Sequence, residues 1–167
     1  MITKPGNTIG PVGQGLNTRF GDYGGAGLNA TDYPPDEYVY EPNPKATLDN
    51  NGDVSYNGTW GYDDYLTSVP CSSGTYCTAN GQPNRRILPV PIVVCSTASG
   101  GTTAFDITAI GCFFMLQTAP TSNSGKEAVF GEFIEDCTVT GGAPGDDSDT
   151  NGAYRIVLYN DPLRTES

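Results

Sequence analysis

Two apolar segments joined by a short connector constrain the fold of this chain more than any other feature. They span residues 87–95 and 103–117, and the connector at 96–102 is rich in Gly, Ser and Thr. Both segments are rich in β-branched and aromatic residues, which favour strands. Two such runs separated by a flexible connector predict an antiparallel hairpin.

The second apolar segment is predicted to be a central strand, because alternate residues point to opposite faces of a sheet. Both faces are apolar, with Phe113 and Met115 on one and Cys112, Phe114 and Leu116 on the other. A strand that is apolar on both faces is usually buried on both. In the first segment, Pro89 and Pro91 have no backbone N–H. Its first half is therefore predicted to lie at an edge or outside regular pairing.

The rest of the chain predicts a single mainly-β domain over residues 1–167. The fold class is an antiparallel, sandwich-like or irregular sheet with long Gly/Pro-rich loops, consistent with 22 Gly and 13 Pro. Further strands are predicted at 38–40, 54–56, 129–139 and 154–159, and no amphipathic helix is predicted. Residues 1–31 are expected to form an irregular N-terminal arm, anchored by Leu16 and Phe20.

The charge of the chain argues against nucleic-acid binding and gives no support to catalysis. It has 19 acidic and 8 basic residues and no histidine, for a net charge of −11. Such a surface repels phosphates, and the commonest general base is missing. No nucleophile motif or phosphate-binding loop is present, and carboxylate pairs such as Glu132 with Glu135 arise by chance in so acidic a chain. We expect no catalytic residues and a protein that is not an enzyme.

Five cysteines without histidine favour disulfides over zinc. We predict bridges between Cys71 and Cys77 and between Cys95 and Cys137, which leave Cys112 as a buried free thiol. The alternative pairs Cys95 with Cys112 across the hairpin. Disulfides imply an oxidising, extracytoplasmic location, namely the periplasm, the cell surface or secretion. No export signal is recognisable, so a leader or membrane anchor is expected to lie upstream or to have been removed.

Calcium is the only cofactor that the sequence suggests. Asp147, Asp149 and Asn151 alternate before a glycine, as oxygen ligands do in loops that wrap this ion. The segment 49–53 (DNNGD) has similar spacing. Neither fragment has the acidic residue that completes an EF-hand at its twelfth position, and such fragments recur by chance in polar loops. A solvated loop without calcium is therefore the favoured alternative.

A Tyr- and Trp-rich region is the best candidate for a binding surface. Tyr56, Trp60, Tyr62 and Tyr65 lie close together among glycines and acidic residues. Aromatic side chains of this kind can bind a glycan or a protein partner. The alternative is that they simply cover a small core.

Several segments, taken in order, resemble a known family. They are GPVGQGLNTRFGDY at 10–23, YPPD at 33–36, RRILPVPIVVC at 85–95, GCFFMLQ at 111–117, GEFIEDC at 131–137 and YRIVLYNDP at 154–162. Together they are similar to the C-terminal extracytoplasmic region of TadE/TadG-like proteins of the Tad (Flp) pilus assembly system. The segment between 37 and 83 has no counterpart in this resemblance.

The resemblance implies a structural role in pilus assembly, as a minor pilin-like subunit, with no catalytic residues. It also implies an N-terminal transmembrane helix upstream, which would be the only contact with a membrane. Expected partners are other pilus or envelope proteins, including further copies of the same chain. The alternative function is an extracellular, adhesin-like module that binds a glycan or protein through its Tyr/Trp-rich region.

Overall fold

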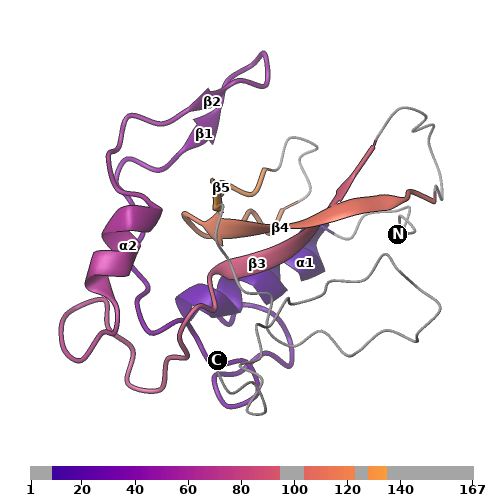
Figure 1. Cartoon of the computed structure of the whole chain (residues 1–167). Coiled ribbons are helices and arrows are strands. Elements are labelled where there is room, and N and C mark those ends of the chain that lie inside the picture. Colours follow the sequence, from indigo (N-terminus) through magenta and orange to yellow (C-terminus); the bar gives the residue numbers. More distant parts are fainter. Residues whose placement is uncertain (1–8, 95–103, 123–127, 135–167) are drawn as a thin grey trace, which may run out of the picture.

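The structure is a computed structural model that describes residues 9–94, 104–122 and 128–134. Its elements, in order, are α1 (Ile9–Asn17), the 3-10 helix η1 (Thr18–Phe20), β1 (Thr47–Leu48), β2 (Val54–Ser55), α2 (Tyr62–Ser68), β3 (Ile87–Val93), β4 (Ile107–Met115) and β5 (Gly131–Ile134). Strands β1 and β2 form one antiparallel sheet, and β3, β4 and β5 form another in that order (Figure 1). With two short α-helices, this is the mainly-β fold that the sequence predicts.

The predicted hairpin is confirmed, with β4 at the centre of its sheet and β3 at an edge. The two prolines do not take β3 out of regular pairing, however. Pro89 lies opposite Cys112 and Pro91 opposite Ile110, and the register shifts only between Ile92 and Val93. A proline is tolerated there because alternate residues of an edge strand need no N–H towards the neighbouring strand.

The prediction of an irregular arm is wrong for residues 9–20, which form α1 and η1. Three glycines make α1 an unfavourable helix by propensity alone. Tertiary contacts compensate, because a side chain at Gly13 would collide with the backbone carbonyl of Pro120. The Asn17 amide also pairs with the backbone of Ala119, accepting from its N–H at 2.6 Å and donating to its carbonyl at 2.9 Å. The helix therefore forms against the chain that follows β4.

Two local predictions between 38 and 68 also need correction. Residues 38–40 form no strand; Tyr38 makes only an isolated bridge with Cys77. Residues 62–68, for which no helix was predicted, form α2, whose first turn includes Asp64. The Asp64 carboxylate accepts the Gly61 N–H at 2.9 Å, so it caps the helix and fixes where it begins.

The core lies where the end of β4 meets α2 and the segment before β1. Its buried members are Ala46, Tyr65, Phe114 and Leu116. Next to it, the buried Gln117 amide accepts from the Ala46 N–H at 2.7 Å and donates to the Ala46 carbonyl at 3.0 Å. The Gln117 side chain thus satisfies the backbone N–H and carbonyl of Ala46, which a neighbouring strand would otherwise have to pair with.

Several predictions fall outside the described residues. These are the strand residues 135–139, the strand at 154–159, Cys95, Cys137, and the calcium ligands Asp147, Asp149 and Asn151. Among the residues that are described, neither helix is long and apolar enough to cross a lipid bilayer.

Glu41 joins the segment before β1 to the end of β4, and this contact should depend on pH. Its carboxylate accepts from the Thr118 N–H at 2.6 Å and from Lys45 Nζ at 2.9 Å. Burial alone would raise the pKa of Glu41, but these hydrogen bonds outweigh burial and lower the pKa. The stabilisation is therefore complete above the ordinary pKa of a glutamate and is lost as the pH falls through the lowered, folded-state pKa.

We expect Glu41→Gln to lower the free energy of unfolding by about 1 kcal/mol near neutral pH. The difference from the parent should shrink as the pH falls through the lowered, folded-state pKa of Glu41, because the carboxyl then becomes protonated in both the folded and the unfolded state. Urea unfolding at neutral pH and over a series of acidic pH values measures it. A constant difference would mean that the Glu41 charge is not involved.

Candidate functional site

The largest fully buried side chain among the described residues is a cation, Arg86, immediately before β3. It is 0% exposed, and its guanidinium donates only to backbone carbonyls. The acceptors are Met115 at 2.8 and 3.0 Å, Leu116 at 2.9 Å, Tyr40 at 3.0 Å and Tyr38 at 3.2 Å. Arg86 thus joins the Tyr38–Tyr40 segment to the end of β4. Burial lowers its pKa to about 10, so it stays charged at neutral pH.

Four aromatic rings surround this guanidinium and come from four different parts of the chain. The distances from Arg86 Cζ to the ring centroids are 4.5 Å for Phe20, 4.8 Å for Phe114, 5.1 Å for Trp60 and 5.7 Å for Tyr65. Aromatic faces attract cations at such distances. Aromatic cages of this kind bind cationic ligands in other proteins, but here the protein's own arginine fills the cage. Arg86 therefore has a structural role.

Asp36 is the buried acid nearest this arrangement. Its carboxylate accepts the backbone N–H groups of Tyr38 and Arg86, each at 3.0 Å, and the Tyr65 hydroxyl at 3.1 Å. Burial raises the pKa of Asp36, and the two backbone N–H groups partly offset this. Burial and the neighbouring Asp36 charge likewise raise the pKa of Tyr65. Every partner is internal, so these groups hold segments together and do not face a substrate.

A second group of rings adjoins the cage, shares Trp60 with it, and reaches solvent. We call Tyr38, Tyr40, Trp60 and Tyr76 the aromatic surface. Tyr40 contacts Tyr76 edge-on at 4.9 Å between centroids and Trp60 at 5.0 Å. Tyr76 is 43% exposed and the other three are partly buried. Because Trp60 also contacts Arg86, the aromatic surface rests directly on the rigid cage beneath it.

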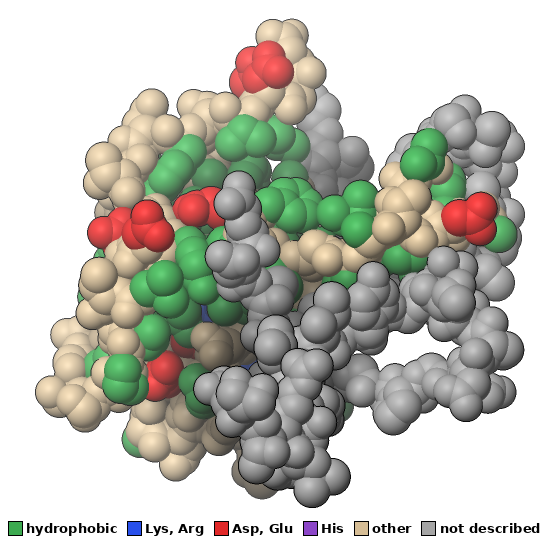
Figure 2. All heavy atoms as spheres, in the orientation of Figure 1, with side chains coloured by type: hydrophobic (Ala, Val, Ile, Leu, Met, Phe, Trp, Pro, Cys, Tyr) green, Lys and Arg blue, Asp and Glu red, His purple; other side chains and the backbone are tan. Residues whose placement is uncertain are grey.

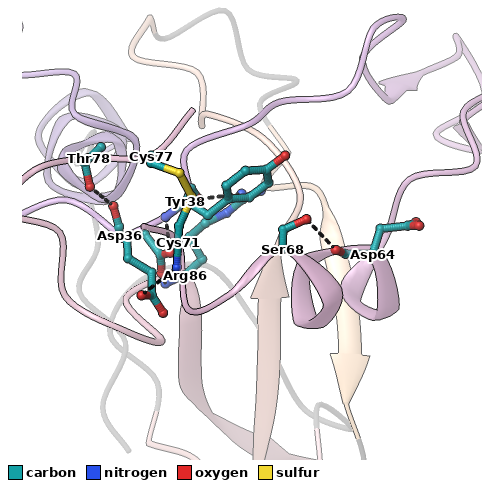
Figure 3. The surroundings of a disulfide bond; sticks show 9 residues. Asp36, Tyr38, Asp64, Ser68, Cys71, Cys77, Thr78 and Arg86 are labelled. Carbon is teal, nitrogen blue, oxygen red and sulfur yellow. Dashed lines mark hydrogen bonds between the residues drawn. A yellow bond between two sulfur atoms is a disulfide. The ribbon is translucent and has the colours of Figure 1, made fainter. Parts of the chain in front are cut away.

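The disulfide between Cys71 and Cys77 holds Tyr76 in this position. The loop is also tied to the chain before β1: the Val39 N–H donates to the Tyr76 carbonyl at 2.9 Å, and the Cys71 N–H donates to Glu37 at 3.3 Å. Figure 3 shows the disulfide next to Tyr38, together with the hydrogen bond from Thr78 to Asp36. The predicted short-range bridge is thus present and serves to position a ring.

Removing this disulfide should loosen the loop without unfolding the domain. We expect Cys71→Ser combined with Cys77→Ser to lower the free energy of unfolding by about 2 kcal/mol, the value for closing so short a loop. Urea unfolding under non-reducing conditions measures the change. Ser73→Ala, an exposed change within the same loop, is the control and should leave stability unchanged. An equal effect of both would show that the bridge contributes nothing.

The structure separates the four residues predicted as a binding surface. Tyr65 is 0% exposed and belongs to the cage, so it cannot touch a partner, and the expectation that it binds is wrong. Tyr62 packs on Phe114 at 5.3 Å and Tyr56 donates its hydroxyl to the Trp60 carbonyl at 2.8 Å. Only Trp60 contributes to the aromatic surface.

Sequence reasoning missed Tyr38, Tyr40 and Tyr76 as surface residues. The strand predicted at 38–40 left Tyr38 and Tyr40 out of the predicted binding surface, and the predicted Cys71–Cys77 bridge gave no role to Tyr76 in the loop that it closes. The sequence signal for Tyr76 was the predicted pairing of Cys71 with Cys77, because so short a bridge also fixes the position of the neighbouring Tyr76. What could not be foreseen was the bridge between Tyr38 and Cys77, which brings the two segments together.

Carboxylates lie close to Tyr56 and Tyr62, which flank Trp60 in the sequence. The Glu132 side chain of β5 reaches the Tyr62 N–H at 3.4 Å, and Asp64 lies at the start of α2. Burial raises the pKa of Tyr56, and the charges of Glu132 and Asp64 raise it further. Figure 2 shows acidic side chains beside apolar ones on this face, around α2. The surroundings therefore favour neutral or cationic partners.

Cys112 is disulfide-bonded, so its prediction as a free thiol is wrong. It lies in the middle of β4, opposite Pro89 and Ile134, and is 2% exposed. Cys95 and Cys137, which were predicted to be joined to each other, lie outside the described residues.

The turn at 49–53 uses its own oxygens internally. Asp49 Oδ1 accepts the N–H of Asn51 at 2.8 Å and of Asp53 at 2.9 Å, and these backbone hydrogen bonds lower the pKa of Asp49. In the described part of the chain, no group of three or more acidic or cysteine side chains is arranged to hold a metal ion.

No protein-family model, curated protein or solved structure matches the chain. Function must therefore be inferred from the geometry of the described residues and from the resemblance seen in the sequence.

Proposed function

We propose that the chain is a non-catalytic structural or assembly component of a bacterial Tad (Flp) type pilus or a related cell-surface filament. In this role it binds a neighbouring pilus or envelope protein through the aromatic surface. The observation that carries the proposal is the rigid contact of Tyr40 with both Tyr76 and Trp60 at a partly exposed site. Preorganised Tyr and Trp side chains lose little entropy on binding and dominate the energy of many protein interfaces.

Two further observations support this proposal. The disulfide of Cys71 with Cys77 and the bonded state of Cys112 suit an oxidising compartment, so we place the protein outside the cytoplasm. The order of family-like segments along the chain agrees with a pilus component. A sandwich-like arrangement of the strands belongs to the same proposal.

Binding to purified Tad pilus and envelope proteins, measured by biolayer interferometry, tests this function. Tyr76→Ala should weaken binding on the order of 10-fold or more, as loss of an interface hot spot does. Tyr33→Ala is a matched control, because Tyr33 is 45% exposed against 43% for Tyr76 but lies outside the aromatic surface. Equal losses for both variants, or no binding to any pilus protein, would refute the proposal.

The second candidate is an adhesin-like module that binds a glycan on the same aromatic surface. It is favoured by the exposed Tyr76 ring beside Trp60, since aromatic faces stack on the apolar faces of sugars. A glycan array separates the two functions. Glycan binding that is lost with Tyr76→Ala and kept with Tyr33→Ala, without binding to pilus proteins, would select this candidate.

A further inference from the structure

The backbone hydrogen bonds of β3 show which of its residues face the open edge of the sheet. The Met115 N–H donates to the Arg86 carbonyl at 2.8 Å, and Ile87 lies opposite Phe114. In an antiparallel ladder, alternate residues face the neighbouring strand. Arg86 and each second residue after it therefore face β4. Ile87, Pro89, Pro91 and Val93 face away from it.

Three of these four outward positions offer no free donor to another strand. Pro89 and Pro91 have no N–H, and the Ile87 N–H donates to the Asn84 carbonyl at 3.1 Å. A strand approaching this edge over residues 87–91 would find carbonyl groups but no donors, so it could not form a regular ladder there. Prolines placed in this way protect natural sheets against unwanted pairing.

The opposite edge, at β5, is different. The Leu116 N–H donates to the Phe130 carbonyl at 2.9 Å, so Phe130, Glu132 and Ile134 face β4. Gly131 and Phe133 consequently face outward. Within the described ranges, the structure gives neither of their N–H groups a partner. Phe133 is also 67% exposed. Val54, in β2, has the same exposed fraction, and no other large apolar side chain of the described residues is more exposed.

We propose that β5 pairs antiparallel with β5 of a second copy of this chain. The two three-stranded sheets then become one continuous sheet, and the prolines of β3 close it at both ends. Association consequently stops at a dimer and does not continue into a fibre. This inference is independent of the function proposed above, which concerns the aromatic surface.

The strand that pairs with β5 is β5 of a second copy of this chain, because the outward-facing backbone of Phe133 can pair with that of another Phe133. With Phe133 opposite the same residue of the other copy, each N–H donates to the other carbonyl and the two rings lie side by side. This register sets Glu132 opposite Ile134, so the two carboxylates do not face each other. Each copy carries a charge of −11, which opposes association. Salt screens this repulsion and should strengthen the dimer.

Sedimentation velocity of the disulfide-bonded protein over a series of concentrations and sodium chloride levels tests the proposal. The parent should show a monomer–dimer equilibrium that shifts towards dimer with salt. Phe133→Pro removes the outward N–H and should weaken the dimer by on the order of 10-fold or more. Phe133→Lys, which keeps the N–H but puts a charge at the edge, should also weaken it. Near-UV circular dichroism checks that both variants are folded.

The closed edge is tested by Pro89→Thr combined with Pro91→Thr, which restores two outward donors. We expect species larger than a dimer. Val90→Thr, at a position facing β4, is the control and should behave as the parent does. A parent that stays monomeric at every concentration and salt level, or a dimer unaffected by Phe133→Pro, would overturn the pairing. A double threonine variant no larger than the parent would overturn the closure.

Discussion

Arg86→Met is expected to lower the free energy of unfolding by about 3–5 kcal/mol, as removal of one partner of a buried charge network does. Methionine has a similar volume, so the loss comes from hydrogen bonding more than from a cavity. Four backbone carbonyls, at Tyr38, Tyr40, Met115 and Leu116, would lose the donors that Arg86 provides. An unsatisfied buried acceptor costs about 1–3 kcal/mol. Urea unfolding monitored by the fluorescence of Trp60 measures the change.

The neighbouring arginine is a matched control for this experiment. Arg85 is partly buried and makes one hydrogen bond of this kind, from Nε to the Pro34 carbonyl at 3.0 Å. Arg85→Met should therefore cost about 1 kcal/mol. Arg86→Lys should recover little, because an ammonium cannot reproduce the planar set of donors. If Arg86→Met and Arg85→Met had the same effect, the buried cation would not hold the fold together.

The second large effect is expected for Asp36→Ala, at about 3–4 kcal/mol. The change leaves two buried N–H groups, at Tyr38 and Arg86, and the Tyr65 hydroxyl without their acceptor. It also removes the negative charge that favours the charged form of Arg86. Asp63→Ala, an exposed change in α2, is the control and should cost no more than about 0.5 kcal/mol.

A double variant shows whether the two charges act together. Residues in one hydrogen-bonded network have effects that do not add. The loss for Asp36→Ala with Arg86→Met should therefore be smaller than the sum of the two single losses, by about 1 kcal/mol or more. Strict additivity would mean that Asp36 and Arg86 stabilise separate parts of the molecule.

The hairpin of β3 and β4 was predictable because its signal is local. Apolar residues on both faces of 103–117 placed β4 at the centre of the sheet, and the prolines placed β3 at an edge. The short disulfide was predictable for the same reason, since only five residues separate its cysteines. What the prolines do at that edge became clear only from the hydrogen-bond pattern.

The helix α1 was not predictable, because its propensity is poor and its stability comes from contacts more than 100 residues away, such as that of Asn17 with Ala119. A bonded Cys112 was only the alternative prediction, because cysteines at strand ends were preferred over one in the middle of a strand. Tyr65 and Tyr76 look alike in sequence, yet one is enclosed and the other is exposed.

By itself, the sequence determined the class of fold, the central strand, and an acidic chain with disulfides, since these depend on composition and on short-range patterns. Tertiary structure alone decided that Arg86 is enclosed, that its cage is already filled, and that Tyr76 is exposed beside the partly buried Tyr38, Tyr40 and Trp60. The physical reason is that burying a cation requires carbonyls and rings from several distant segments at once. No single segment of the sequence contains all of these groups, so no local pattern could reveal the site.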